Sequence, residues 1–162
     1  MWYEKGAPNG RPFPVLEGVV VDAPIEERFV TRFVRSKRRE RLLFELTTPK
    51  RRSRGLDRFC HQAQDILDPA KIRMVGENLD QREEFKAFVG AHDDTCCVLT
   101  GDASIDGATL RLSDAVRAAR MACDAVIIVG TDFAVVVTEA TRGGRDMYLL
   151  TTKDLGPLKA MG

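Results

Sequence analysis

Apolar residues in the first third of the chain recur at helical spacing. An amphipathic stripe of this kind predicts a helix, and its members are Ile25, Phe29, Val30, Phe33 and Val34. The stripe lapses through a run of basic residues and resumes with a rotated phase in the leucines that follow. We therefore expect a helical region over 24–47 with a kink or break near Ser36.

A second helix is predicted over 49–67. Thr48 is placed to cap it, Pro49 suits its first turn, and the Asp68-Pro69 pair suits its end. On a helical wheel the apolar residues fall within a sector of about 120°; they are Leu56, Phe59, Cys60, Ala63, Ile66 and Leu67. Gly55 weakens this helix by about 1 kcal/mol, so its start lies at Pro49 or only at Gly55.

Short apolar runs rich in β-branched residues dominate the second half and predict strands. They cover 71–75, 95–100, 124–130, 133–140 and 146–152, and a further run at 15–22 precedes the helices. Asp106-Gly107 and Gly143-Gly144 suit hairpin turns, and helices are expected at 79–89 and, capped by Ser113, at 113–122. The order predicts an α+β fold, in which an N-terminal helical layer packs on a mostly antiparallel sheet of about five strands with two further short helices.

The runs "AVIIV" and "FAVVV" do not alternate apolar with polar residues. Strands of this type are covered on both faces. The helices of 24–67 can cover one face, whereas the two short helices are expected to leave part of the other face bare. An exposed apolar patch marks an interface, so we predict a symmetric homodimer with surfaces near 124–138 in contact.

The length and composition fit one domain over 1–162, with an irregular strap at 1–14 and a loose tail at 153–162. The N-terminus lacks the basic and apolar regions of a secretory signal. The four cysteines of the chain sit among apolar neighbours and form no disulfide framework. This favours a soluble protein of the reducing cytoplasm.

Charge is distributed unevenly along the chain. From Arg28 to Arg58 there are twelve basic and three acidic residues, whereas Met74 to Asp114 holds three basic and nine acidic ones. Nucleic-acid-binding domains usually carry a basic balance overall, but the net charge here is +1. The two regions of opposite sign can face each other within the chain or between subunits.

Opposite the apolar sector of the helix 49–67, basic side chains form a stripe. Arg51, Arg54, Arg58 and His61 define this arginine column, which extends about 15 Å at the rise of an α-helix. The column is the solvated back of a surface helix, or it contacts a phosphate backbone or an acidic protein surface.

We interpret the chain as a non-catalytic binding or regulatory module, with a sequence-independent nucleic-acid-associated protein and a small-molecule enzyme as alternatives. The aromatic residues of the region, Phe29, Phe33, Phe44 and Phe59, are all expected on apolar faces, which leaves no stacking platform.

Catalytic and metal-binding patterns are weak. Cys60 and His61 are adjacent, but neighbours on a helix diverge by about 100°, so they cannot form a catalytic pair. Only His92-x3-Cys96 has ligand-like spacing, and no nucleotide-binding motif is present. We expect no cofactor and no metal site.

A last candidate is the turn "TRGGRD", which places Arg142 and Arg145 on either side of two glycines. The pair is either an anion-binding pinch or two solvated side chains that splay apart.

Overall fold

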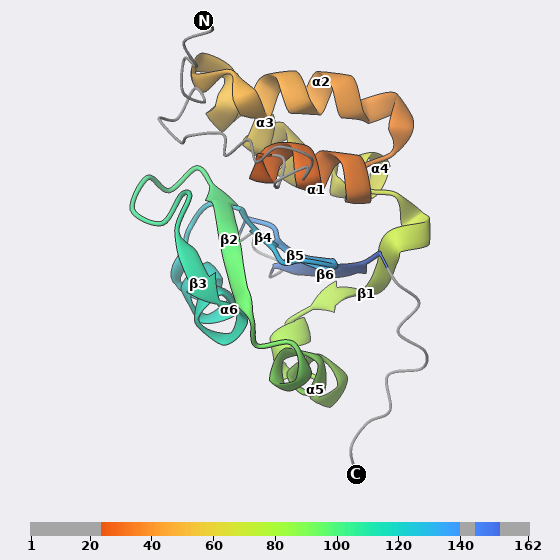
Figure 1. Cartoon of the computed structure of the whole chain (residues 1–162), viewed down its shortest axis with the longest axis vertical. Helices are drawn as coiled ribbons and strands as arrows, with labels where there is room; N and C mark the ends of the chain where they lie inside the picture. The colour runs from red at the N-terminus through yellow and green to blue at the C-terminus, as the bar shows by residue number, and fades with distance from the viewer. Residues whose placement is uncertain (1–23, 140–144, 153–162) are drawn as a thin grey trace, which may run out of the picture.

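A computed structural model describes residues 24–139 and 145–152, in which helices come first and a sheet follows. Four helices lie on one side of the sheet (Figure 1): α1 (Ile25–Phe33), α2 (Ser36–Thr47), α3 (Pro49–His61) and the single turn α4 (Ala63–Ile66). The α+β fold with an N-terminal helical layer is confirmed.

The sheet has six strands in the order β1-β6-β5-β4-β2-β3, one more than expected, and every neighbouring pair is antiparallel. Its strands are β1 (Ile72–Glu77), β2 (Thr95–Thr100), β3 (Thr109–Arg111), β4 (Val126–Val129), β5 (Phe133–Val137) and β6 (Asp146–Thr151). The turn expected at Asp106-Gly107 leads into β3, and Gly107 takes a φ of 78°, which glycine adopts without strain.

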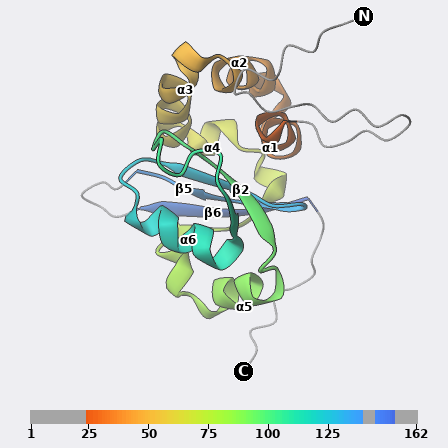
Figure 2. The same cartoon turned by 60° about the vertical axis from the view of Figure 1, so that its left-hand side comes forward.

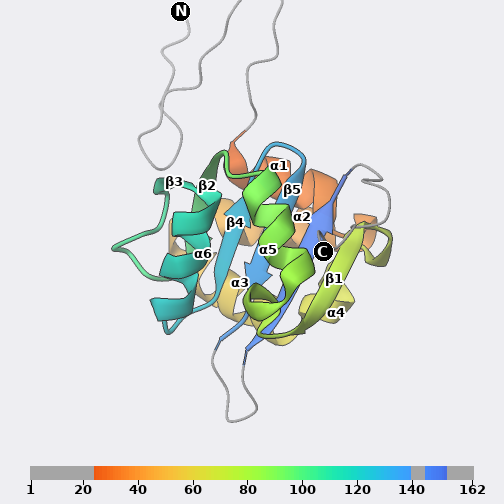
Figure 3. The same cartoon turned by 90° about the horizontal axis from the view of Figure 1, so that it is seen from below.

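Two further helices cover the opposite face of the sheet, as Figure 3 shows from below: α5 (Glu83–Ala91) and α6 (Leu112–Met121). The short 3₁₀ turns η1 (Pro69–Lys71) and η2 (Leu79–Gln81) flank β1. Ser113 does not cap α6, because the helix begins one residue earlier, at Leu112, with Arg111 at the N-cap position. The Ser113 N–H donates instead to the carboxylate of Asp93 at 2.9 Å.

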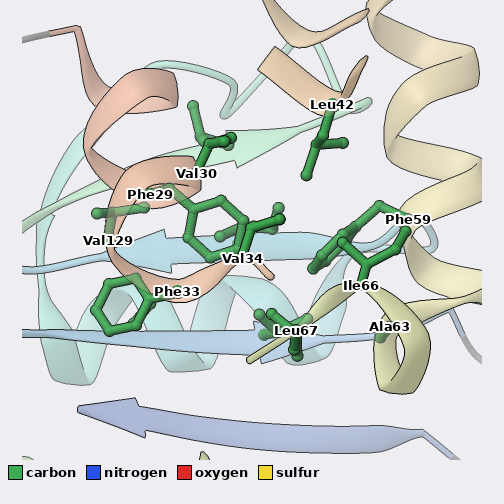
Figure 4. Packing of buried hydrophobic residues seen from close by; sticks show 14 of the residues in the cluster. Phe29, Val30, Phe33, Val34, Leu42, Phe59, Ala63, Ile66, Leu67 and Val129 are labelled. Carbon is green, nitrogen blue, oxygen red and sulfur yellow. The ribbon is translucent and has the colours of Figure 1, made fainter. Parts of the chain in front are cut away.

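Hydrophobic cores fill both faces of the sheet. On the helical-layer side, α1 and α3 meet through Phe29 and Phe59, whose rings pack edge to face at 5.7 Å (Figure 4). On the other side, Phe85 and Phe88 of α5 pack with Phe133 of β5 in a second cluster. All residues of β4 and β5 are buried, which confirms that these strands are covered on both faces.

This coverage comes from one chain and removes the reason for predicting a homodimer. The expectation that the short helices leave part of the sheet bare is wrong, since α5 and α6 pack over its centre. Among the described residues the exposed large hydrophobic side chains are scattered: Phe44, Val75 and Met121. The homodimer itself stays a prediction, and light scattering on the purified protein tests it.

The break expected near Ser36 is confirmed. Val34 forms an isolated β-bridge with Leu67, and the N–H of Arg35 donates to the carbonyl of Ile66 at 2.9 Å. Because these two residues pair with the end of α4, the helix cannot continue through them. The chain therefore turns, and α2 starts on a new axis.

Several predicted segments lie outside the described residues: the strap at 1–14, the strand at 15–22, the Gly143-Gly144 turn and the tail at 153–162. Among the residues that are described, no helix is long and apolar enough to cross a membrane.

Candidate functional site

Exposed cationic side chains lie on both α2 and α3. The two helices pack side by side in the helical layer (Figure 2). On α2, Lys37 and Arg38 lie four and three residues before Arg41, so each is a neighbour of Arg41 on the helix surface. We call the basic α2–α3 face the set of exposed cations Lys37, Arg38, Arg41, Lys50, Arg51 and Arg54. Among the described residues, Arg41 is the only member of this face with an ion-pair partner, Glu45 at 3.3 Å.

Four other arginines of the run donate to backbone carbonyls and so hold the fold together. Arg28 and Arg32 of α1 donate to the carbonyls of Gly130 and Thr131 in the β4–β5 turn. Arg35 donates to Leu67, and Arg39 donates to Val34 at 2.9 Å. The basic run therefore divides into cations that donate to other parts of the fold and cations that are left exposed to solvent.

The predicted arginine column is split by the structure. Arg51 and Arg54 are exposed and belong to the basic α2–α3 face. Arg58 is half-buried and pairs with Glu45 of α2 at 2.6 Å, so its guanidinium does not belong to the solvated part of the column. His61, one turn further on, lies among carboxylates and not among cations.

The side chain of Phe44 is 54% exposed, so the expectation that it lies on an apolar face is wrong. Leu42 and Leu46, two residues away on either side, supply the buried side of α2, and Phe44 projects in a different direction. The guanidinium of Arg51 lies over its ring, 5.3 Å from the centroid. The basic α2–α3 face thus contains an exposed aromatic ring beside a cation, an arrangement on which a nucleobase can stack.

Arg52, which lies outside the predicted arginine column, connects three elements. Its guanidinium donates to Glu26 of α1 at 3.0 Å, to Asp106 of the β2–β3 loop at 2.7 Å and to the Leu46 carbonyl at 2.9 Å. Burial lowers the pKa of Arg52, but the hydrogen bonds and charges of Asp106 and Glu26 outweigh it and raise the pKa above its ordinary value. This contact joins the basic and acidic regions of the chain, as one of the two expected arrangements requires.

Three metal-ligating side chains converge at the end of α3. The Nε2 atom of His61 lies 3.5 Å from Asp57 Oδ1 and 4.0 Å from Glu139 Oε2. One ligand atom from each side chain lies within 4.8 Å of the others. Residue spacing could not reveal this set, because Glu139 follows β5, far along the chain from α3.

Two open hollows adjoin this group. One is a groove of about 410 Å³ that runs from α3 and α4 to β6, and its lining includes His61, Asp65, Glu77, Glu139, Asp146 and Tyr148. The neighbouring hollow is lined by Arg54, Asp57, Asp124 and Glu139 among others. Glu139 lines both, so the group lies at their junction.

The two buried cysteines, Cys60 and Cys96, are poor nucleophiles. Cys60 is buried, and burial together with the nearby carboxylates, Glu139 first, raises the pKa of its thiol to about 12. A thiol of this kind is protonated at neutral pH and is a poor nucleophile. Burial likewise raises the pKa of Cys96 to about 12. His92, which has ligand-like spacing from Cys96, contacts the Phe88 carbonyl through Nδ1 and stacks on the Phe88 ring.

The anion pinch proposed for Arg142 and Arg145 is not supported on the side that can be described. Arg145 donates to the carbonyls of Ala119 and Ala122 at the C-terminal end of α6. These bonds occupy both terminal nitrogens of its guanidinium, so Arg145 anchors the start of β6 to α6. Arg142 lies outside the described residues.

No family model, curated protein or solved structure matches this chain. Any function assigned to it therefore rests on its own residues.

Proposed function

We propose that this protein is a non-catalytic binding module whose basic α2–α3 face contacts the phosphate backbone of nucleic acid without reading its sequence. One observation carries the proposal. The exposed ring of Phe44 lies beneath Arg51, a cation that has no ion-pair partner among the described residues. Arginines and lysines neutralise phosphates, and an aromatic ring among them stacks with unpaired bases.

The preferred partner is a single strand. In a duplex the bases are already stacked, whereas a single strand offers them to an exposed ring, and stacking contributes about 1–3 kcal/mol per base. The division of the basic residues into paired and unpaired cations also favours nucleic acid as the partner. The cations that donate to backbone carbonyls or carboxylates are used by the fold, so the unpaired ones on α2 and α3 are left for solvent or a ligand. An acidic protein surface is the alternative partner, which uses the same cations but does not need the ring.

Fluorescence anisotropy of labelled oligonucleotides tests the proposal. At about 50 mM salt we expect a dissociation constant of tens of micromolar or tighter for a random single strand, with weaker binding to duplex of the same sequence. The double variant R51A/R54A lowers the affinity, and the salt slope falls by about 0.7 for each phosphate that the protein no longer neutralises. F44A reduces the preference for single strands by an amount set by the loss of one stacked base.

A matched control is R82A/R117A, which removes two exposed arginines from the α5 and α6 side of the molecule. This variant is expected to bind as the wild type does. Absence of binding at tens of micromolar in low salt removes the nucleic-acid proposal. Equal losses in both double variants show that binding follows total charge and not the basic α2–α3 face.

A further inference from the structure

The end of α3 offers a second, separate site. We propose that Asp57, His61 and Glu139 bind a divalent transition-metal ion such as Zn²⁺ or Mn²⁺. Asp57 and His61 are one helical turn apart and lie on the same face of α3. Glu139, which follows the C-terminal end of β5, reaches the same point from the sheet.

The spacing of the three ligand atoms is close to that of a coordination shell. Ligands about 2.0–2.2 Å from a zinc ion lie roughly 3.0–3.5 Å from each other. His61 Nε2 is already 3.5 Å from Asp57 and 4.0 Å from Glu139. The side chain of His61 is 62% exposed, that of Asp57 58% and that of Glu139 34%. Small rotations, which exposed side chains make freely, are enough to close the set around an ion.

The donor atoms select the class of metal. One imidazole nitrogen with two carboxylate oxygens suits zinc, manganese, iron or cobalt, whereas calcium and magnesium prefer shells made wholly of oxygen. Two carboxylates also offset the charge of a divalent cation. Further carboxylates line the adjoining groove between α3 and β6, namely Asp65, Glu77 and Asp146. Their field favours the approach of a cation.

Three protein ligands leave at least one position of a tetrahedral shell open. The site lies at the junction of the two hollows, so water or a ligand's oxygen can reach that position from either side. The competing explanation of the same geometry is an ion pair between a protonated His61 and the two carboxylates. An ion pair of this kind does not bind a metal, so a direct measurement of metal binding separates the two.

The chain has two histidines, His61 and His92, which makes nuclear magnetic resonance of the imidazole rings a specific readout. The full-length protein, freed of metal by a chelator, is titrated with Zn²⁺ alone. We expect the ring signals of His61 to shift and saturate at one equivalent, while those of His92 stay in place. Unchanged His61 signals at millimolar Zn²⁺ would overturn the proposal, and so would equal shifts of both rings.

Variants separate this site from binding at the cysteines, of which Cys123 is exposed. Binding of Mn²⁺, which prefers nitrogen and oxygen to sulfur, is followed by electron paramagnetic resonance in parallel. H61Q and E139Q are each expected to weaken Zn²⁺ and Mn²⁺ binding by about tenfold or more. The matched controls are H92Q, the other histidine, and E77Q, a carboxylate of the same groove outside the group. Unchanged affinity in H61Q and E139Q, or an equal loss in the controls, contradicts the assignment.

Discussion

Replacing Arg52 with methionine tests what joins the helical layer to the sheet. Arg52 is 12% exposed at its side chain and pairs with Glu26, which is 6% exposed, and with Asp106, which is 27% exposed. Methionine keeps most of the side-chain volume but none of the donors. The variant R52M therefore leaves the Glu26 carboxylate buried without a partner of opposite charge.

Removing one partner of a fully buried ion pair costs about 3–5 kcal/mol. Asp106 is accessible enough to recover water, and its carboxylate also accepts from the Thr100 N–H at 3.1 Å, so we expect the lower end, a loss of about 3 kcal/mol. With a urea dependence of about 2 kcal/mol/M for a chain of this size, the unfolding midpoint falls by about 1.5 M. Urea titration followed by circular dichroism measures it.

Two further variants identify the cause of the loss. R54M changes an exposed arginine on the same helix and is expected to alter the free energy of unfolding by less than about 0.5 kcal/mol. E26Q/R52M is expected to be more stable than R52M, because a neutral amide costs less to bury than a carboxylate. The reasoning fails if R52M lies within about 1 kcal/mol of the wild type. A double variant no more stable than R52M would assign the loss to packing.

Three other substitutions or reagents test local features. G55A is expected to lower the free energy of unfolding by about 1 kcal/mol or more in the same titration. The added Cβ would lie 2.8 Å from the Cβ of Glu45. This clash outweighs the gain in helix propensity, which is about 1 kcal/mol. Under a thiol reagent at neutral pH, Cys123 reacts first, since the two buried thiols have pKa values of about 12; equal rates for all would contradict this. Hydrogen bonds from Ser113, of which the backbone N–H bond has the largest effect, lower the pKa of Asp93. The stability that the Asp93 carboxylate contributes is therefore present above its unfolded pKa of about 3.9, and it is lost as pH falls through its lower pKa in the folded protein. D93A is thus expected to reduce the melting temperature at pH 7 but not below the folded pKa, and an equal reduction at both would show that the carboxylate charge is not involved.

The elements themselves were predictable because their signals are local. The phase change in the apolar stripe marks the break before Ser36, and the two unalternating runs mark strands with two buried faces. The extent of coverage was not predictable, because it depends on the order of strands. β4 and β5 lie at the centre of the sheet, whereas the edge strands β1 and β3 stay partly exposed. Two short helices therefore need to cover only the centre.

The candidate sites show a similar limit. A helical wheel gives the direction of each α3 side chain relative to its own core, and in this respect the exposed positions of Arg51 and Arg54 agree with it. It contains nothing about neighbouring helices, so it could not place Glu45 beside Arg58. Nor could it bring Glu139 to His61, because that contact depends on where β5 ends in the sheet.

Arg52 is the case in which the signal was present in the sequence. On the same wheel it falls between Phe59 and Ala63, inside the apolar sector. A charged residue in that position is either exposed by a break in the helix or paired with opposite charge in the interior. The helix is continuous there, so pairing follows, and the uneven charge of the chain indicates that acidic residues beyond α3 can supply the partner. Its identity, Glu26 on one side and Asp106 on the other, follows only from the packing of α1 and the β2–β3 loop against α3.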